Sequence, residues 1–489
     1  MSTSHHGHPR LALSVVLFAA ATTIMDISLL IIALPAIGRD LAPPPATLAL
    51  VPLAFSLAFA LGLLPLGRLG DLIGRRQVLM AGAAVWTVAG LATALAPSIA
   101  LLLASRLLAG FAAAALLPQA MALASGLAPP DGRVSGIGLF IATTASGSIL
   151  SPLLGGAVLT LDPGGIGWRL IFLYQGTAGL LALSGARLTL ARSAGRPDRK
   201  TAGFDGRGTA LVSLAILALV VPLAIGRLAG WPAWIVLPVA AVLPVSQLLR
   251  RHLDRAAALN RPQILPASLL KQPVIVGTVA LTAIVFSAGP GIFAALSTVL
   301  QAGIGFAPDK TGASLAAFPV GVLAASLIVG RLGGQPTDLQ LGAGALLFAL
   351  GMLATRALLG TGSPTPLPFA AALGLSGLGM GALVTALFRA VMAAAPPADH
   401  GAAAGVQQAF QQVGTTLSFA VIGLMFEGAR SAAIAGGATA AQALTGAGRQ
   451  ACLYPAAVFS LLIAALLVRR LAASRRASPS PEDLGGNGR

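Results

Sequence analysis

The stretch that decides the fold is Gly67-Arg68-Leu69-Gly70-Asp71-Leu72-Ile73-Gly74-Arg75-Arg76. We predict a short charged loop here, between two long apolar runs at 47–66 and 78–96. Charged side chains are rare and costly in lipid, so a cluster of charges at the connection between two apolar segments indicates a function. The rest of the chain is therefore interpreted around the membrane that this joint borders.

The composition indicates that lipid, rather than water, surrounds most of the chain. Of its 489 residues, 56% are hydrophobic and 9% are charged, and the mean hydropathy is +0.88. Soluble globular proteins carry about 25% charged residues, so a water-facing surface cannot be built from so few. The 59 glycines and 33 prolines agree, because both residues are more frequent in membrane helices than in soluble ones.

The formal charge of +17 raises the alternative of a nucleic-acid partner. If the amino terminus is cytoplasmic, however, most of the 31 Lys and Arg fall in the inner loops and tails. That bias sets orientation during membrane insertion. Topology therefore explains the basicity, and we expect no nucleic-acid partner.

Segmenting the chain into apolar runs of about 20 residues predicts an all-α membrane protein. The fourteen predicted spans are 11–37, 47–66, 78–96, 99–128, 134–160, 169–190, 207–226, 232–250, 274–301, 312–333, 341–361, 366–395, 400–426 and 452–470. An even number places both termini on one side. The basic tail favours the cytoplasm for that side, through Arg469, Arg470, Arg475 and Arg476.

Two basic inner loops divide the chain into six, two and six spans. We predict a cytoplasmic tail at 1–10, a six-helix bundle at 11–190, and basic loops with two extra helices (207–226 and 232–250) at 191–272. A second six-helix bundle follows at 273–470, and a disordered cytoplasmic tail at 471–489. Cys452 is the single cysteine, so no disulfide forms within the chain. The tail histidines have metal-ligand chemistry, but disorder is the preferred interpretation and no metal is expected: His5, His6 and His8.

A short repeat relates the two predicted bundles. Gly67-Arg68-Leu69-Gly70-Asp71 follows the second span, and Gly330-Arg331-Leu332-Gly333-Gly334 follows the tenth, which is the second span of the last six. Related bundles that enclose a central cavity are the arrangement of many secondary transporters. The repeat therefore favours that arrangement over a chance match.

The motifs taken in order resemble the major facilitator superfamily, in its fourteen-span multidrug-efflux (drug:proton antiporter) branch. The resemblance covers nearly the whole chain, beginning with the charged segment 67–76. The other matching stretches are Met25-Asp26-Ile27-Ser28 with Ala33-Leu34-Pro35, then Arg106 with Gly110, then Gly138, Gly147, Pro152, Gly155 and Gly156, then Trp168-Arg169 with Ile171-Phe172, and finally Phe204-Asp205. Four positions depart from the family pattern: Ile31, Ser151, Gln175 and Gly334.

The charged segment combines flexible backbone with opposite charges. Gly67, Gly70 and Gly74 lack Cβ atoms and let helix ends approach closely. Asp71 can lie against a helix amino terminus, and Arg75 or Arg76 can pair with it or bind lipid headgroups. The resemblance implies that this segment, with Arg68, latches the cytoplasmic side of an outward-open state. The alternative is a basic loop that only sets topology.

Asp26 and Arg106 are the one acid and the one base predicted to lie well inside spans. They lie ~16 Å and ~10 Å from the outer end at 1.5 Å per residue, so they can meet. Intramembrane ionisable groups usually mark a pathway or relay. We hypothesise that Asp26 exchanges a proton and that Arg106 biases its protonation, since a nearby cation favours the carboxylate. The alternative is a static ion pair.

Two further spans carry candidate residues. In span five, the small residues around Ser151 and Pro152 favour a tightly packed, pliant helix that limits leak and bends between states: Gly136, Gly138, Gly147, Gly155 and Gly156. The alternative is ordinary packing of small residues between helices. In span thirteen, Gln407 shares a face with Gln411, and Gln408 with Gln412. These amides are candidates for substrate contacts, although bonding between helices is equally typical of membrane proteins.

The sequence thus predicts a bacterial inner-membrane transporter with both termini cytoplasmic, working as a monomer without a cofactor. We expect it to exchange protons for a small, largely apolar organic compound, because its bundles hold so few charges. The alternatives are a metabolite or siderophore exporter, an uncoupled facilitator or a non-transporting sensor. A membrane enzyme is disfavoured, because His252 and His400 have no acid cluster near them.

Overall fold

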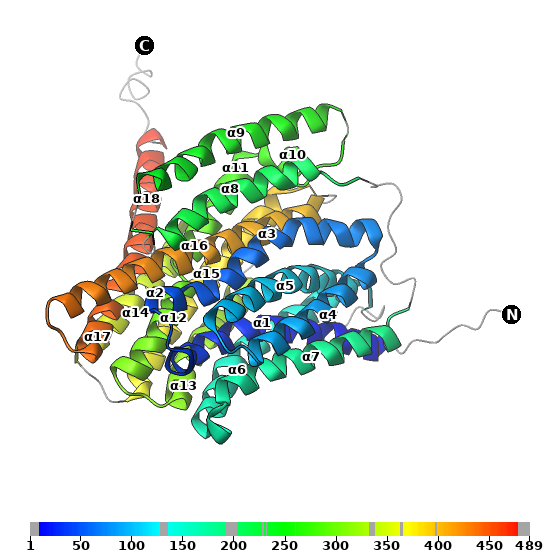
Figure 1. Cartoon of the computed structure of the whole chain (residues 1–489). Helices are drawn as coiled ribbons and strands as arrows, with labels where there is room; N and C mark the ends of the chain where they lie inside the picture. The colour runs from blue at the N-terminus through cyan, green and yellow to red at the C-terminus, as the bar shows by residue number, and fades with distance from the viewer. Residues whose placement is uncertain are drawn as a thin grey trace, which may run out of the picture.

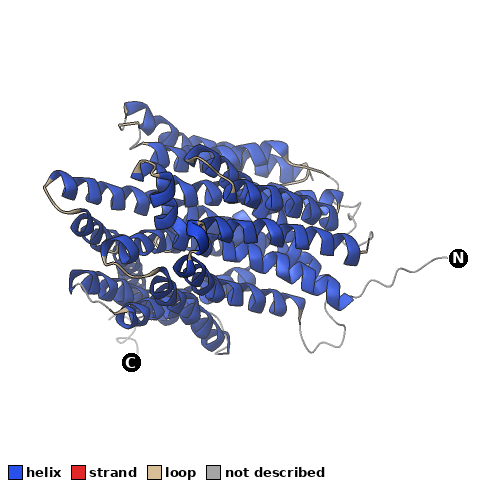
Figure 2. Cartoon of the chain, turned by 60° about the horizontal axis from the view of Figure 1, so that its bottom comes forward, coloured by secondary structure: helices blue, strands red, loops and turns tan. Residues whose placement is uncertain are grey.

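The computed structural model describes residues 9–127, 135–191, 203–226, 229–230, 232–259, 261–331, 338–361, 365–396 and 399–477. Within these residues the regular structure is entirely helical, as Figures 1 and 2 show. Thirteen helical stretches are long and apolar enough to cross a membrane. The one predicted span that is not among these thirteen, 169–190, forms as helix α7, so the predicted all-α membrane fold is confirmed.

The first six long helices pack mainly on one another. They are α1 (Pro9–Leu41), α3 (Leu50–Ile73), α4 (Arg75–Ala94), α5 (Ile99–Leu127), α6 (Gly136–Leu161) and α7 (Gly167–Thr189), with short α2 (Pro45–Leu48) before α3. Small residues allow the close crossings. A Cβ on Gly110 of α5 would collide with the carbonyl oxygen of Phe55 on α3, and one on Gly90 of α4 with Gly176 of α7.

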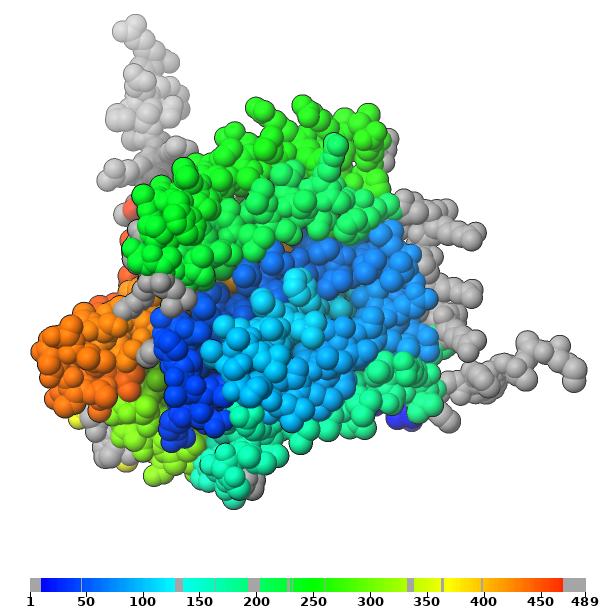
Figure 3. Space-filling view, viewed as in Figure 1, coloured from blue at the N-terminus to red at the C-terminus, as the bar shows by residue number. Residues whose placement is uncertain are grey.

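Two helices follow that belong to neither set of six. They are α8 (Gly206–Ile225) and α9 (Val236–Ala258), which pack on each other, with the short helix η3 (Ala233–Ile235) before α9. Asp205 caps α8 by accepting a hydrogen bond from Gly208 N at 2.8 Å. α8 contacts both α3 and α16, so the inserted pair touches both halves of the molecule (Figure 3).

The second set of six begins after short α10 (Ala267–Leu270). It comprises α11 (Pro273–Ser287) with α12 (Pro290–Thr298) and η4 (Val299–Gly303), α13 (Pro308–Arg331), α14 (Asp338–Thr361), α15 (Pro366–Ala394), α16 (His400–Ala435), and α18 (Leu453–Ala477) preceded by α17 (Ala440–Ala451). Its pairing repeats that of the first six. α3 packs on α5 and α4 on α7, just as α13 packs on α15 and α14 on α18.

A hydrogen bond repeats with this pairing. Gln119 of α5 donates to the carbonyl oxygen of Leu66 at 3.1 Å, and Arg389 of α15 donates to that of Val329 at 3.1 Å. Leu66 and Val329 each precede the first glycine of one copy of the sequence repeat. The two copies of the sequence repeat are therefore also alike in local structure. Residues 332–334 of the second copy lie outside the described residues.

Several predicted boundaries were wrong. The segment 67–76 is not a loop: α3 continues to Ile73, and only Gly74, at φ 113°, separates it from α4. The span predicted at 274–301 is broken between Ser287 and Pro290, because proline cannot donate its share of the backbone ladder. α16 runs to Ala435 rather than to 426, and the unpredicted helix α17 follows it.

The chain ends also differ in part from expectation. α18 continues as helix to Ala477, which includes the first residues of the tail predicted to be disordered at 471–489. The tail histidines, at positions 5, 6 and 8, and most of the basic loop at 191–206 lie outside the described residues.

Candidate functional site

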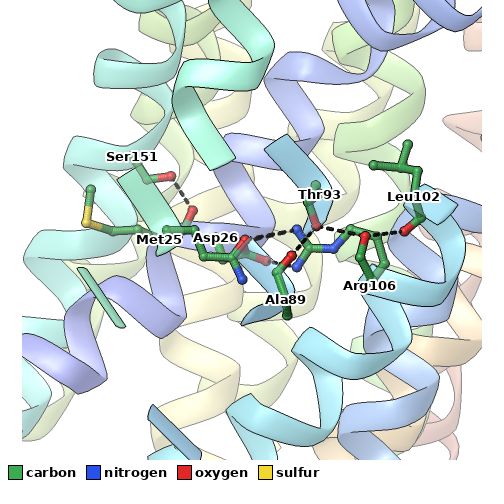
Figure 4. Close-up of polar contacts among 9 residues, drawn as sticks. Met25, Asp26, Ala89, Thr93, Leu102, Arg106 and Ser151 are labelled. Atoms are coloured by element: carbon green, nitrogen blue, oxygen red, sulfur yellow. Dashed lines mark hydrogen bonds and ion pairs between the residues drawn. The ribbon is translucent and has the colours of Figure 1, made fainter. Parts of the chain in front are cut away.

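A buried ion pair joins the two charged residues predicted inside the spans. Arg106 of α5 donates from Nη2 to Oδ2 of Asp26 at 2.8 Å and from Nη1 to Oδ1 at 3.2 Å (Figure 4). Arg106 is fully buried and Asp26 is 2% exposed. A guanidinium that holds both carboxylate oxygens makes a strong, directional pair. The structure therefore brings together α1 and α5 through these two side chains.

Two aromatic rings and an amide complete the surroundings of Arg106. Its guanidinium carbon lies 5.2 Å from the ring centre of Phe55 and 5.1 Å from that of Phe172. Nη1 also reaches the side-chain oxygen of Gln175 at 3.5 Å. Gln175 departs from the family pattern, but it keeps an amide oxygen beside the arginine. Among the described residues, no partner takes Nε of Arg106 or Nε2 of Gln175, so the cluster retains donors.

Hydroxyl groups extend this polar cluster on both sides (Figure 4). Thr93 of α4 donates to Oγ of Ser105 at 2.8 Å, one residue before the arginine. Ser151 of α6 donates to the carbonyl oxygen of Met25 at 2.7 Å, one residue before the aspartate. The second departure from the family pattern therefore has a role here, because Ser151 ties α6 to α1 beside the ion pair.

The charged segment is organised within the amino-terminal half. Arg75 Nη2 lies 3.3 Å from Asp71 Oδ1 across the break at Gly74, with both side chains about 40% exposed. Arg76 Nε donates to the carbonyl oxygen of Leu190 at 3.1 Å, just after α7 ends. A Cβ at Gly70 would collide with Gln119, so this glycine is needed for the crossing of α3 and α5.

The glycine motif of α6 faces two neighbours. A Cβ at Gly147 or Gly155 would press on α1, at 3.2 Å from the Ala21 carbonyl oxygen and 3.1 Å from Leu29. One at Gly156 would lie 2.6 Å from the carbonyl oxygen of Pro308 at the start of α13. Gly138 meets only Ser135, so it takes no part in this packing.

The motif therefore lies where the two halves of the molecule meet. Gly312 of α13 fits against the carbonyl oxygen of Pro152, reciprocating the fit of Gly156. Beyond them, Asp309 N donates to Thr160 Oγ1 at 3.0 Å. On the neighbouring side, Gln301 donates to the carbonyl oxygen of Ile32 at 3.1 Å. These contacts close the end of the molecule at which α1 and α6 finish and α13 begins.

The four glutamines of α16 do not act as one group. Gln412 donates to Oγ of Ser56 on α3 at 2.8 Å, and the same hydroxyl lies 2.9 Å from Oγ1 of Thr416. Gln407 donates to Thr282 of α11 at 2.7 Å, and its own oxygen has no described partner. Gln408 is exposed and Gln411 is half-buried. Bonding between helices is thus the observed role of Gln407 and Gln412.

The other family motifs fasten helix ends. Asp40 accepts from Trp168 Nε1 at 2.9 Å and from Arg169 Nη2 at 3.0 Å, and Arg169 also donates to the carbonyl oxygen of Ala96. Asp205 binds His252 of α9 at 2.7 Å and the backbone N–H of Ile264 at 3.2 Å. One carboxylate thereby ties both inserted helices to the segment that leads into the second half.

Glu427 is a largely buried acid that lies just beyond a predicted span. Because α16 extends past 426, Glu427 lies within the helix, 12% exposed, with Arg430 Nε 2.9 Å from its Oε2. Both residues line a cavity between the two halves. The signal that could have found them is the spacing Glu427–Arg430, since residues three apart share one helical face. Ending the span at 426 concealed it.

The described residues hold no group of three or more His, Cys, Asp or Glu that could ligate a metal ion. Two ion pairs inside the long helices each join an acid to an arginine: Asp26 with Arg106 and Glu427 with Arg430.

Two sets of six long apolar helices, with a buried ion pair in the first set and buried hydrogen bonds between the sets, are the architecture of a polytopic membrane transporter. The family model of the Major Facilitator Superfamily matches residues 16–335. The chain belongs to this superfamily, which confirms the family predicted from the motifs.

Curated relatives place the chain among export and resistance proteins. It is 31% identical to a "Probable actinorhodin transporter" of Streptomyces coelicolor, over 85% of this chain and 72% of the relative. It is 31% identical to a puromycin resistance protein of Streptomyces alboniger, over 86% and 83%. It is 29% identical to a "Tetracenomycin C resistance and export protein" of Streptomyces glaucescens, over 86% and 76%.

Solved structures agree on the fold. A bacterial homologue of the human lysosomal transporter Spinster, in an inward-facing and occupied conformation, matches with a TM-score of 0.66 and 16% identity, covering 96% of this chain and 98% of that one. A POT family transporter in complex with 5-aminolevulinic acid matches with a TM-score of 0.66 and 14% identity, covering 97% and 98%.

Proposed function

We propose that this protein exports a small, largely apolar organic compound by alternating access. Membership of the major facilitator superfamily and the resistance and export proteins among its relatives support drug export. The observation that carries the mechanism is the buried pair of Asp26 and Arg106, because an ionised group in this setting is retained for transport or relay.

Proton antiport is the coupling that this pair supports best. When a proton adds to Asp26, the carboxyl group becomes neutral and its attraction to Arg106 weakens. Phe55, Phe172 and Gln175 then remain to hold the guanidinium, and the donors left over at Arg106 and Gln175 can take new partners. Loss of the proton restores the pair. One proton thus switches the contact between α1 and α5.

The charged segment 67–76 is proposed to latch the inner side when the molecule faces outward. Its exposed carboxylate and arginine are held by a weak local bond, so they are free to exchange partners as the halves move. The conformation described here is closed at the opposite end, through α6–α13 and α1–η4 contacts. We assign that closed end to the outer face.

The proposed setting is the inner membrane of a bacterium, with both termini cytoplasmic and the transporter working as a monomer. The excess of Lys and Arg in the loops assigned to the inside supports this orientation. Reporter tags fused to each end would test it. Tags that report opposite faces would overturn the even number of spans.

Transport is tested with the purified protein in sealed vesicles that are loaded in parallel with labelled puromycin, which carries a basic amine, and with labelled naphthoate, an aromatic carboxylate. Export that accelerates under an imposed proton gradient and vanishes with an uncoupler is expected. Equal flux with and without the gradient would favour the uncoupled facilitator. A susceptibility screen that compares an overexpressing strain with a deletion strain would then separate drug export from export of a metabolite.

A further inference from the structure

A cavity of about 330 Å³ lies between the two halves, near the end of the molecule that is closed by α6 and α13. One wall comes from α1 and α3, and the other from α12, η4, α16 and α17. The lining is mostly apolar, and three aromatic rings contribute to it: Phe306, Phe419 and Phe426. Its volume lies at the lower end of the range of small-molecule sites, which is about 300–1,000 Å³.

Three of the lining residues carry charge. They are Arg39 from the end of α1 and the pair Glu427 and Arg430 from α16, which gives the lining a formal charge of +1. Glu427 is occupied by Arg430 through Nε. Within the described part of the chain, no partner binds the two terminal nitrogens of Arg430 or the guanidinium of Arg39. The nearby acids are engaged elsewhere, Asp40 with Arg169 and Asp309 with Thr160.

We propose that this cavity binds an organic anion with a flat aromatic body and one carboxylate or ionised phenol. The rings of the cavity take the apolar body, and the unoccupied guanidinium donors of Arg39 and Arg430 take the acid group. A guanidinium fork matches the geometry of a carboxylate and binds it more strongly than a neutral acceptor. The inference rests on the proposed function and narrows it to a substrate class.

The charge balance selects against the other ligand classes. A cation would face two arginines and one glutamate that is already paired. A neutral compound would bury its body equally well but would leave the arginine donors unused. Because the walls come from both halves, a bound anion would also hold α1 against α16, and so would favour this conformation over one in which the halves part at this end.

The test measures equilibrium binding to the purified full-length protein in detergent, with three probes that share one ring system. They are naphthoate, naphthamide and naphthylmethylammonium, which are anionic, neutral and cationic. We expect naphthoate to bind about tenfold more tightly than naphthamide, the increment of a hydrogen bond to a charged group. The cation should bind most weakly. Arg430→Gln and Arg39→Gln should each reduce the preference for naphthoate.

Arg449→Gln is the matched control, because Arg449 is an exposed arginine of α17 that does not line the cavity. It should leave the preference unchanged. Arg39 is exposed, so its replacement keeps the fold even if removal of Arg430 from its partly buried pair does not. A wild-type protein without preference for naphthoate, or a preference that survives both substitutions, overturns the proposal. Binding needs no transport, so vesicles that move nothing would instead count against the proposed function.

Discussion

Thr160 of α6 and Asp309 of α13 bind each other twice across the boundary between the halves. Thr160 Oγ1 donates to Asp309 Oδ1 at 3.2 Å and accepts from Asp309 N at 3.0 Å. The hydroxyl therefore serves a carboxylate and a backbone donor at the start of α13. The proposed alternating access requires this end to open, and these contacts would then break in every cycle.

The pair Thr160→Cys and Asp309→Cys, in a Cys452→Ala background, should form a disulfide under oxidation and stop transport. Reduction should restore it. Replacing Cys452, the natural cysteine, ensures that the two introduced thiols can pair only with each other. Because Cys452 is buried, its replacement leaves the surface unchanged. The measurement is the flux, before and after reduction, of whichever labelled probe the unaltered protein exports, with each single cysteine as a control. Full transport by the cross-linked protein would show that this end need not open.

Asp26→Asn should abolish uphill export while downhill flux continues, because the amide cannot take up and release a proton. Removing one partner of a buried ion pair also costs about 3–5 kcal/mol of stability, which must be separated from the functional effect. Flux is therefore normalised to folded protein. Asp40→Asn offers a comparison, since Asp40 pairs with Arg169 at a partly exposed site. A variant at position 26 that still pumps against a gradient would place coupling elsewhere.

Asp71→Asn should leave insertion and folding intact and cut transport severely. Its pair with Arg75 is about 40% exposed, so the pair contributes at most about 1 kcal/mol to stability. A loss of transport would then report on the latch rather than on the fold. The readouts are membrane abundance, thermal unfolding and flux. Transport at the rate of the unaltered protein would leave the segment with a topological role alone.

Gln412→Leu should weaken the contact between α3 and α16 and reduce transport several-fold, since it leaves the buried hydroxyl of Ser56 with one partner fewer. Gln408→Leu is the matched control, because Gln408 lies on the same helix but is exposed. Flux and unfolding temperature are measured for both. Equal losses in the two variants would mean that a general effect on α16, rather than this bond, is responsible.

The sequence was sufficient for the fold because membrane spans are encoded by length and apolarity, which need no knowledge of neighbours. Asp26 and Arg106 were found by the same logic, since charge inside a span is conspicuous. Their estimated depths allowed the two residues to meet, and the structure shows that they do. Boundaries were harder to predict. Single residues such as Gly74 and Pro290 set where a helix ends or begins. α16 also continues as a helix beyond the apolar stretch from which its span was predicted.

The cavity and its charges could not be predicted from spans alone. Arg39 and Arg430 are 391 positions apart in the sequence, and both line one cavity only because of the way the two halves are arranged. The hydrogen-bond partners of the glutamines could not be predicted either, because they depend on which neighbouring helix Gln407 and Gln412 each face. Such partners are fixed by packing between distant segments, and a single sequence without contacts does not record them.

The inserted helices α8 and α9 make the two flanks of the molecule unequal. They lie over the flank where α3 meets α16, while α6 and α13 form the flank at the opposite side in Figure 1. A compound dissolved among the acyl chains would not reach the boundary between the halves on the α3–α16 flank, because α8 and α9 cover that flank. Its route from bilayer to interior would run past α6 and α13, so lateral recruitment in this transporter would be one-sided.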